Sequence, residues 1–260
     1  FRTNIEGLGI HFLHIRSPEP DALPLIMTHG WPGSVVEFLK VAGPLTAPVA
    51  HGGERCDAFH LVLPSLPGFG FSDKPDRTGW GVDRIAGAWI TLMGRLGYHR
   101  YVAQGGDWGA TVTSAIASAR PPGCIAAHLN VARVRPTQTQ MHETTPAEDK
   151  ALADHHSFQE IGTGYSKIQA TRPQTIGYGL TDSPAAQAAW IYDKYVDWTD
   201  HDNGPEDVLS FDDMLDNIMM YWLPATGASS ARLYWESFGA GFSRQTIDMP
   251  MGISIFPKEI

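Results

Sequence analysis

Short apolar runs alternate with segments of helical periodicity along the first half of the chain. The runs end in turn residues and are typical of buried parallel strands, whereas the longer segments place apolar side chains three or four residues apart. The expected strands cover residues 9–15, 23–30, 59–68, 100–106 and 124–131. The expected helices cover residues 34–45, 80–97 and 109–119. This alternation predicts an α/β protein with a mostly parallel sheet and helices on both of its faces.

The pattern changes after about Arg135. From there to Ser237 the periodicity is helical, with scattered Trp and Tyr, and a strand pattern returns only at 251–257. We therefore expect three parts: a first core part at 1–134, an inserted helical cap at 135–237, and a resumed core at 238–260 that is incomplete at its C-terminal end. Both ends of the chain fall in strand-like sequence, so we expect a chain that is cut at both ends.

Charge and composition exclude several classes of function. The formal net charge is −9 and Lys and Arg form no cluster, which argues against a nucleic-acid partner. No apolar run approaches the roughly 20 residues of a membrane span, so membrane contact is not evident. The two cysteines, Cys56 and Cys124, give neither a disulfide framework nor a metal-ligand spacing. We expect both to be small buried side chains.

Residues 105–109 read Gly-Gly-Asp-Trp-Gly and join an expected strand to an expected helix. This order fits the Gly-x-nucleophile-x-Gly elbow of hydrolases, with Asp107 where many of them carry Ser. Glycine tolerates the strained dihedral angles and the close approach of helix and strand that such a turn requires. Asp107 then stands at a helix N-terminus, where partial positive charge favours an anion. An ordinary Asp N-cap is the alternative, and the pentapeptide alone leaves both open.

Two further segments support the elbow. The segment 27–34, MTHGWPGS, ends an earlier strand where such hydrolases carry the second donor of their oxyanion hole. The backbone N–H groups of Trp31 and Trp108 are therefore expected to converge on one oxygen atom. The segment 66–75, LPGFGFSDKP, contains Gly-x-Gly but lacks the later glycine and the βαβ context of a dinucleotide site. No cofactor is expected.

Five segments carry a family resemblance, in this order along the chain: HGWPGS, PGFGFSDKP, GGDWG, GYSKIQATRPQTIGYGLTDSP and ARLYWESFG. With them the chain resembles the epoxide hydrolases of the α/β-hydrolase fold, in the branch that contains the microsomal and juvenile-hormone enzymes. The resemblance extends over essentially the whole chain. It implies an α/β-hydrolase fold with a helical cap, a small hydrophobic epoxide and water as reactants, and no cofactor or metal. It also implies a role in detoxification or aromatic hydrocarbon catabolism.

The reaction assigns roles to particular residues. An ionised carboxylate attacks carbon without first losing a proton, so Asp107 is expected to form an alkyl ester with the epoxide. The ring oxygen leaves as a strong base and needs a neutral proton donor, a task that a phenol can perform. The resemblance implies this role for Tyr165 and Tyr234, and implies that Glu259 orients a histidine base. The remaining cap tyrosines are expected only to pack, namely Tyr178, Tyr192, Tyr195 and Tyr221.

The expected histidine base is not present in this sequence. In this fold it follows the acid in chain order, whereas the last histidine here, His201, precedes the acid and lies in the cap. His29 is expected to be structural, and His128 falls in a buried strand. His155 and His156 lack further metal ligands at useful spacing and are expected on a solvated helix face. The base that cleaves the ester is therefore not assigned.

Other functions stay open at this stage. Trp31, Trp108 and Trp190 suit an apolar substrate pocket, although core packing explains them equally well. A haloalkane dehalogenase also pairs an Asp nucleophile with a following Trp, but it expels halide and does not need two cap tyrosines. A chain that truly ends at Ile260 would bind epoxide, or be alkylated once, without turnover. The expected location is cytoplasmic, and the oligomeric state stays open, with a homodimer allowed.

Overall fold

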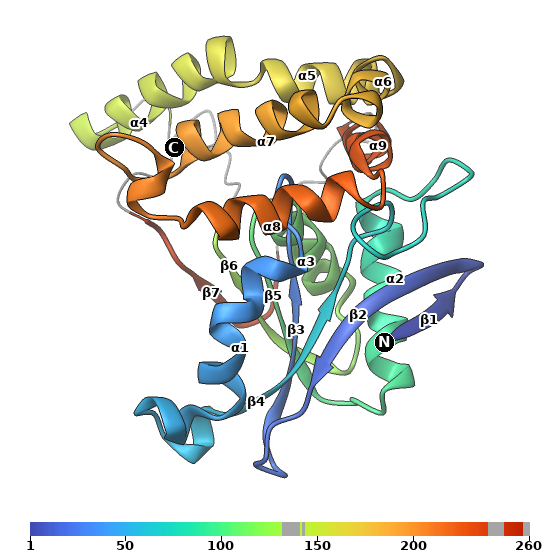
Figure 1. Cartoon of the computed structure of the whole chain (residues 1–260). Coiled ribbons are helices and arrows are strands. Elements are labelled where there is room, and N and C mark those ends of the chain that lie inside the picture. Colours follow the sequence, from blue (N-terminus) through green and yellow to red (C-terminus); the bar gives the residue numbers. More distant parts are fainter. Residues whose placement is uncertain (132–140, 142–143, 239–246, 257–260) are drawn as a thin grey trace.

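One sheet forms the centre of the described part of the chain (Figure 1). The computed structural model describes residues 1–131, 141, 144–238 and 247–256. In these residues the sheet has seven strands in the order β1-β2-β4-β3-β5-β6-β7. The strands are β1 (Arg2–Ile5), β2 (Leu8–Ile15), β3 (Leu23–Thr28), β4 (Phe59–Pro64), β5 (Tyr101–Gly105), β6 (Cys124–Leu129) and β7 (Met251–Ile253). From β4 to β7 all neighbours are parallel, which confirms the predicted mostly parallel sheet.

The strand predicted at 9–15 is β2, but the hydrophobic pattern does not predict that β1 and β2 form a hairpin. These strands are antiparallel, and Glu6 and Gly7 join them with φ angles of 51° and 88°. Positive φ at both loop residues is the type I′ geometry, which matches the twist of a hairpin. Glu6 stands where Asn or Asp is usual, so the turn is hard to recognise in the sequence.

Alternate side chains of the central strands face two layers of helices. Leu25 and Met27 pack in the cluster that includes α1 (Leu39–Thr46). Ile26, which lies between them, packs instead in the cluster that includes α2 (Val82–Arg95) and α3 (Trp108–Ala119). Successive side chains of a strand point to opposite faces, so the sheet is buried on both sides. This burial explains why β3 is an almost continuous apolar run.

Several elements are shorter than the sequence pattern predicts. β3 ends at Thr28, β4 at Pro64 and β7 at Ile253. The segment expected to be one helix at 34–45 is divided between the 3-10 turn η1 (Val35–Phe38) and α1. After β3 and β4 the apolar character continues because the following loops are buried, as at Trp31 and Leu66, whereas Ile255 and Phe256 after β7 are exposed. These loops lie at the carboxyl ends of the parallel strands.

A layer of helices covers that end of the sheet (Figure 1). Its members are α4 (Pro146–Ser157), the π-helical turn η5 (Phe158–Gly162), α5 (Gly164–Thr171), α6 (Pro173–Asp182), α7 (Pro184–Trp198), the 3-10 turn η6 (Pro205–Asp207), α8 (Phe211–Trp222) and α9 (Gly227–Phe238). The predicted core–cap boundary at 134/135 lies outside the described residues and stays a prediction. None of the described helices combines the length and the apolar character needed to cross a bilayer.

The two cysteines have different environments. Cys124 is buried in β6, as expected, whereas Cys56 is exposed, so the expectation of burial is wrong for it. Cys56 lies in the 3-10 turn η3 (Arg55–Asp57), and the neighbouring Asp57 charge raises the pKa of its thiol. A short turn with charged neighbours stays in contact with solvent, which the count of cysteines alone could not reveal.

Candidate active site

Asp107 occupies a sharp turn between β5 and α3. Its φ of 50° and ψ of −120° lie in a region that residues with a side chain rarely adopt. A Cβ on Gly105 would collide with the backbone of Gly109, and a Cβ on Gly109 would collide with the carbonyl of Thr28. The glycines therefore allow the helix to start directly against the strands, and the strained residue between them is the one that carries the carboxylate.

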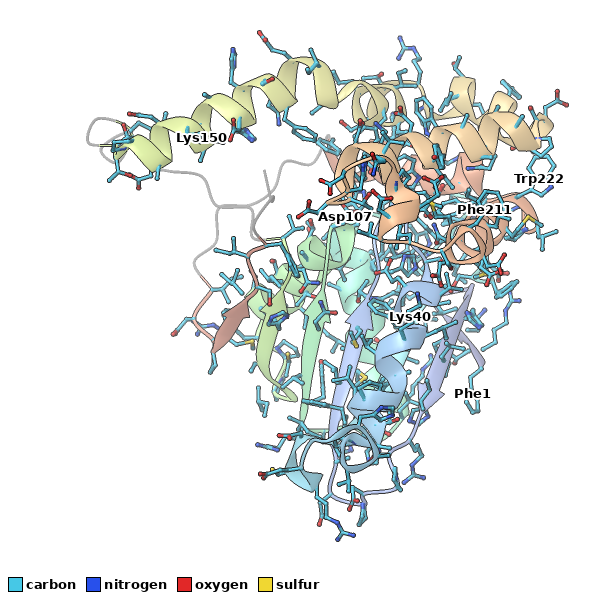
Figure 2. All side chains as sticks on the ribbon, turned by 60° about the vertical axis from the view of Figure 1, so that its left-hand side comes forward. Phe1, Lys40, Asp107, Lys150, Phe211 and Trp222 are labelled. Carbon is cyan, nitrogen blue, oxygen red and sulfur yellow. The ribbon has the colours of Figure 1, made fainter. Side chains whose placement is uncertain are left out.

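The loops after β3 and β5 meet because these strands are parallel neighbours, with Thr28 paired to Gly105 at their carboxyl ends. The Trp31 backbone N–H donates a hydrogen bond to Asp107 Oδ1 at 2.9 Å. A Cβ on Gly30 would collide with the same carboxylate. Figure 2 shows Asp107 where the sheet meets the cap helices. The structure thus brings the Trp31 backbone to Asp107, while the predicted convergence of the Trp31 and Trp108 N–H groups on one oxygen stays a prediction.

His29 fixes the loop that carries Trp31. Its ring is fully buried, Nε2 accepts a hydrogen bond from the Leu66 N–H at 3.1 Å, and Nδ1 donates to the Gly30 carbonyl at 2.9 Å. A ring that accepts at one nitrogen and donates at the other is neutral. Burial lowers the pKa of His29 from 6.5 to about 4, although the Gly30 contact opposes this shift. These contacts agree with the structural role predicted for His29.

The lowered pKa of His29 predicts a loss of stability in acid. Between about 6.5 and about 4 the unfolded chain binds a proton at this residue and the folded protein does not, so the free energy of unfolding falls as the pH falls. The contribution reaches about 3 kcal/mol near pH 4. Urea unfolding at a series of pH values gives the free energy of unfolding as a function of pH. This free energy should fall less steeply with falling pH for His29→Gln than for the wild type. His155→Gln, on exposed α4, should keep the wild-type pH dependence. Equal slopes for all three proteins would contradict the buried neutral ring.

Aromatic rings from the loops after β3 and β5 pack against aromatic rings of α5 and α9. Trp31 stacks on Tyr165, with ring centroids 5.0 Å apart, and Trp108 meets Tyr234 edge to face at 4.8 Å. The centroids of Tyr165 and Tyr234 are 6.0 Å apart. The two tyrosines come from α5 and α9, and the structure brings both to the loops that carry Asp107 and Trp31.

The phenol of Tyr234 is in an environment that preserves its proton. Burial raises the pKa of Tyr234 well above its usual value, and the charge of Asp107 and the neighbouring Tyr165 raise it further. The indole of Trp108 acts in the opposite direction and is the smaller influence. Tyr234 is 2% exposed, so its hydroxyl is kept from bulk water. The hydroxyl is thus neutral at neutral pH and lies within the electrostatic reach of Asp107.

A buried cation, which helical periodicity does not reveal, lies next to Tyr165. The Lys194 side chain is 7% exposed and pairs with Asp193 at 2.7 Å and Asp197 at 2.6 Å. Its Nζ is 5.3 Å from the ring centroid of Tyr165. Attraction between the ammonium and the ring face helps to hold Tyr165 in place. The sequence gives no sign of this contact, because Lys194 and Tyr165 belong to different helices.

A second group of polar residues connects the cap to the loop after β3. Asn217 Nδ2 donates to the Pro32 carbonyl and to Tyr195 Oη, each at 2.7 Å. Tyr221 Oη donates to the Gly33 carbonyl at 2.6 Å. The sequence predicts only packing for Tyr195 and Tyr221. They do pack. The Tyr221 hydroxyl also joins α8 to the loop, whereas the Tyr195 hydroxyl accepts from Asn217, which itself binds the loop.

The other predicted residues are exposed, make contacts within the helical layer, or lie outside the described part. Tyr178 is 69% exposed, so the expectation that it packs is wrong, because it lies on the solvent side of α6. Tyr192 donates to Glu206 at 2.7 Å, and the Trp190 indole donates to Gln169 at 3.3 Å. Glu259, the predicted acid, lies outside the described residues.

The remaining histidines are placed by ordinary contacts. His128 lies within 3.0 Å of Ser254 Oγ, across the junction of β6 with the chain after β7. His155 and His156 are exposed on α4, in agreement with the expected solvated face. His201 Nε2 lies 2.9 Å from the Val196 carbonyl. No group of three or more His, Cys, Asp and Glu in the described residues is arranged to hold a metal ion.

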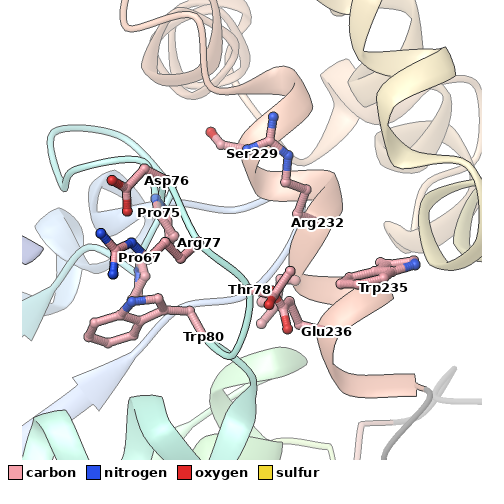
Figure 3. A pocket seen from close by; sticks show the side chains of 11 residues that line it. Pro67, Pro75, Asp76, Arg77, Thr78, Trp80, Ser229, Arg232, Trp235 and Glu236 are labelled. Carbon is pink, nitrogen blue, oxygen red and sulfur yellow. The ribbon is translucent and has the colours of Figure 1, made fainter.

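A separate cavity of about 250 Å³ lies between the loop at 67–80 and α9 (Figure 3). Trp235, Arg232 and Glu236 of α9 line it, on the helix that also carries Tyr234. Asp107 does not line this cavity. The residues expected to carry chemistry therefore lie elsewhere, beneath the cap.

Comparison with profiles of known protein families shows the family to which the chain belongs. The profile described as "alpha/beta hydrolase fold" matches residues 24–163, and the profile described as "Epoxide hydrolase N terminus" matches residues 1–38. The chain therefore belongs to the α/β-hydrolase fold family, as its sheet and its elbow indicate.

Several individual proteins and one solved structure are similar to this chain over most or all of its length. A Stigmatella aurantiaca protein named "Putative epoxide hydrolase" is 56% identical over all of this chain, and Epoxide hydrolase 1 of Oryctolagus cuniculus is 36% identical. The chain covers 59% and 64% of these two proteins. The crystal structure of the juvenile hormone epoxide hydrolase of Bombyx mori is similar with a TM-score of 0.85 and 35% identity, over 98% of this chain and 66% of that one.

Proposed function

We propose that the protein hydrolyses epoxides to vicinal diols through an alkyl ester on Asp107. One observation supports this proposal above all: the strained elbow holds the Asp107 carboxylate within electrostatic reach of Tyr234, whose ring lies next to that of Tyr165, and the Trp31 N–H already binds Oδ1. The names of the relatives agree with this function. The chain spans only part of their length, so the activity is inferred for this protein.

The first half of the reaction opens the ring. An oxygen of Asp107 forms a bond to an epoxide carbon as the carbon–oxygen bond of the ring breaks. The electron pair goes to the ring oxygen, which takes a proton from Tyr165 or Tyr234. The neutral phenol of Tyr234 is suited to this task, because burial and the Asp107 charge hold its pKa high.

The second half cleaves the ester. Water attacks the ester carbonyl, and the oxygen that becomes negative is the one that the Trp31 N–H already contacts. We assign the Trp108 N–H as the second donor to that oxygen, and Glu259 as the acid that orients the base. None of the described residues is assigned as the base itself.

The substrate class follows from the surroundings of the carboxylate. Trp31, Trp108, Tyr165 and Tyr234 provide apolar ring surface, and the two phenols supply protons for a leaving alkoxide. A halide ion that leaves a haloalkane needs hydrogen-bond donors to stabilise it, but it does not take up a proton as a leaving alkoxide does. The aromatic surroundings therefore favour a small hydrophobic epoxide over a haloalkane.

Intact-mass spectrometry with styrene oxide tests this function. We expect a covalent adduct of one styrene oxide per chain that maps to Asp107, or release of the diol where the ester is cleaved. A persistent adduct without diol would show that only the first half of the reaction takes place. Chloride release from a chloroalkane together with no reaction on styrene oxide would contradict the proposal and favour a dehalogenase.

A further inference from the structure

The Lys194 side chain lies inside the protein, although both of its carboxylate partners lie at the surface. Its exposed fraction is 7%, whereas Asp193 and Asp197 keep 66% and 47% of their side-chain surface exposed. An ordinary surface pair is different, as Lys150 and Asp154 of α4 show, because that lysine is 76% exposed. A salt bridge on the outside of a helix does not require a buried ammonium group. Another contact therefore accounts for the position of Lys194.

The Lys194 ammonium lies against two aromatic rings. Its Nζ is 5.3 Å from the ring centroid of Tyr165 and 5.6 Å from that of Trp198. The two rings also meet each other edge to face, with centroids 5.3 Å apart, and Trp31 stacks on Tyr165. These distances are within the range of favourable cation–ring and ring–ring interactions. The cation of α7 is thus held against a phenol that the proposed mechanism uses as a proton donor.

Lys194 carries its charge at neutral pH. Burial acts to lower the pKa of its ammonium group, but the hydrogen bonds to Asp193 and Asp197 outweigh this effect and raise the pKa above its usual value. The two carboxylates are largely solvated, so water screens their charges more than it screens the buried ammonium. The charge that acts on Tyr165 at short range is therefore positive.

The other charged side chains on the helices around Tyr165 have partners elsewhere. On α5, Lys167 donates to a backbone carbonyl of η5, and Arg172, which follows α5, donates to the carbonyl of the residue before it. On α9, Arg232 donates to a side chain of α6, and Glu236 accepts from the loop before α2. Among the described residues, the cation of α7 is thus the one that contacts the Tyr165 ring.

The second phenol is in the opposite electrostatic environment. The ring centroid of Tyr234 lies 6.0 Å from that of Tyr165, and burial, followed by the charge of Asp107, raises the pKa of Tyr234 well above its usual value. A raised pKa keeps Tyr234 neutral, as a hydrogen-bond donor must be, but the same environment opposes the anion that full loss of the proton would leave. Because Lys194 contacts Tyr165, a negative charge is less costly on that phenol.

We propose, building on the epoxide-opening function above, that Lys194 is a positioning residue for the proton transfer: its ammonium holds the Tyr165 ring and stabilises the phenolate that remains when Tyr165 protonates the ring oxygen. Tyr234 keeps its proton and donates a hydrogen bond to the same oxygen. Lys194 does not touch the substrate and acts through Tyr165 alone. The two phenols of the cap therefore have different tasks.

Charge and atoms balance over one reaction cycle. As an oxygen of Asp107 bonds to the epoxide carbon, the carbon–oxygen bond of the ring breaks, and the ring oxygen takes the electron pair and the proton of Tyr165. The negative charge thus moves from Asp107, which becomes a neutral ester, to Tyr165 beside Lys194. In the second half, water supplies a hydroxyl group to the ester carbonyl and a proton to the departing diol oxygen. Asp107 then ionises and its proton returns to Tyr165, so the net reaction is epoxide plus water to diol.

The pH dependence of ester formation tests the role of Lys194. Protein in excess over styrene oxide is mixed at a series of pH values, and intact mass gives the labelling rate at each pH. The rate should fall at high pH, where the donor phenol has already lost its proton. Lys194→Met should label about 10-fold more slowly at neutral pH and should move this fall to higher pH by roughly one unit, because the phenolate has lost its cation. Lys194→Arg keeps the charge and should restore both the rate and the position of the fall.

Further variants separate the effect of the charge from that of packing. Asp197→Asn removes a negative charge from beside the ammonium, so it should move the fall to lower pH, and it is a surface substitution that should change stability little. In a Tyr165→Phe background, Lys194→Met should slow labelling no further, since two changes that act through one group are not additive. Lys150→Met, which breaks a surface pair, should match the wild type.

Several results would overturn the role of Lys194 and leave the proposed function intact. These are a fall at unchanged pH in Lys194→Met, a fall in Asp197→Asn that does not move to lower pH, and a full further loss of rate from Lys194→Met in the Tyr165→Phe background. If Lys194→Met does not fold, the shift in Asp197→Asn decides. No adduct in the wild type would overturn the proposed function, and the role of Lys194 with it.

Discussion

Asp107→Asn is expected to lower ester formation and diol release by at least about 10⁴-fold, since removal of a nucleophile leaves only binding and oxyanion contacts. The amide of asparagine attacks carbon far more weakly than a carboxylate does. Its oxygen can still accept the Trp31 N–H, and asparagine tolerates positive φ better than most residues, so the elbow should keep its geometry. Intact mass after exposure to styrene oxide, followed by peptide mapping, measures the loss.

The control is Asp149→Asn, on the exposed surface of α4. It should keep wild-type labelling, because Asp149 is remote from the elbow in sequence and its carboxylate binds Thr144. Equal thermal unfolding temperatures for the two variants would show that Asp107→Asn loses labelling because the nucleophile is gone and not because the protein unfolds. An adduct of normal yield in Asp107→Asn, attached to another side chain, would disprove the assignment of the nucleophile.

The sequence predicts the elbow and its partner loop because both depend on local patterns. Glycines at 105 and 109 are needed where helix and strand approach too closely for a Cβ. Apolar runs identify β3 and β5 as parallel strands, and parallel neighbours bring their carboxyl-end loops together. The apolar runs do not show that β3 and β5 are neighbours, so the contact of Trp31 with Asp107 is predicted only with the help of the hydrolase motifs. Their roles in catalysis remain proposals.

The positions of the cap residues depend on how the helices pack against the core, and the periodicity of the sequence does not reveal this packing. Tyr165 and Tyr234 are two tyrosines among eight, and only the family motifs distinguish them. Tyr195 and Asn217 come from α7 and α8, so neither their mutual hydrogen bond nor the bond from Asn217 to the Pro32 carbonyl can be read along the chain.

The double variant Tyr165→Phe, Tyr234→Phe is expected to slow ring opening by more than either single change, each of which removes a general acid worth roughly 10²–10⁴-fold. Phenylalanine keeps the ring, so the stack of residue 165 on Trp31 and the edge contact of residue 234 with Trp108 are retained. Thermal stability should therefore change little. Single-turnover labelling with styrene oxide measures the rate of the first half alone.

The single variants reveal how the two phenols share the ring oxygen. If one phenol can replace the other, each single variant should lower the logarithm of the labelling rate by less than half as much as the double variant does. The reason is that the effects of two groups that contact the same atom are not additive. Tyr192→Phe is the matched control, since it removes a phenol that binds Glu206 at 2.7 Å and should label at the wild-type rate. A double variant that also labels at the wild-type rate would require another proton source and would overturn the role assigned to Tyr165 and Tyr234.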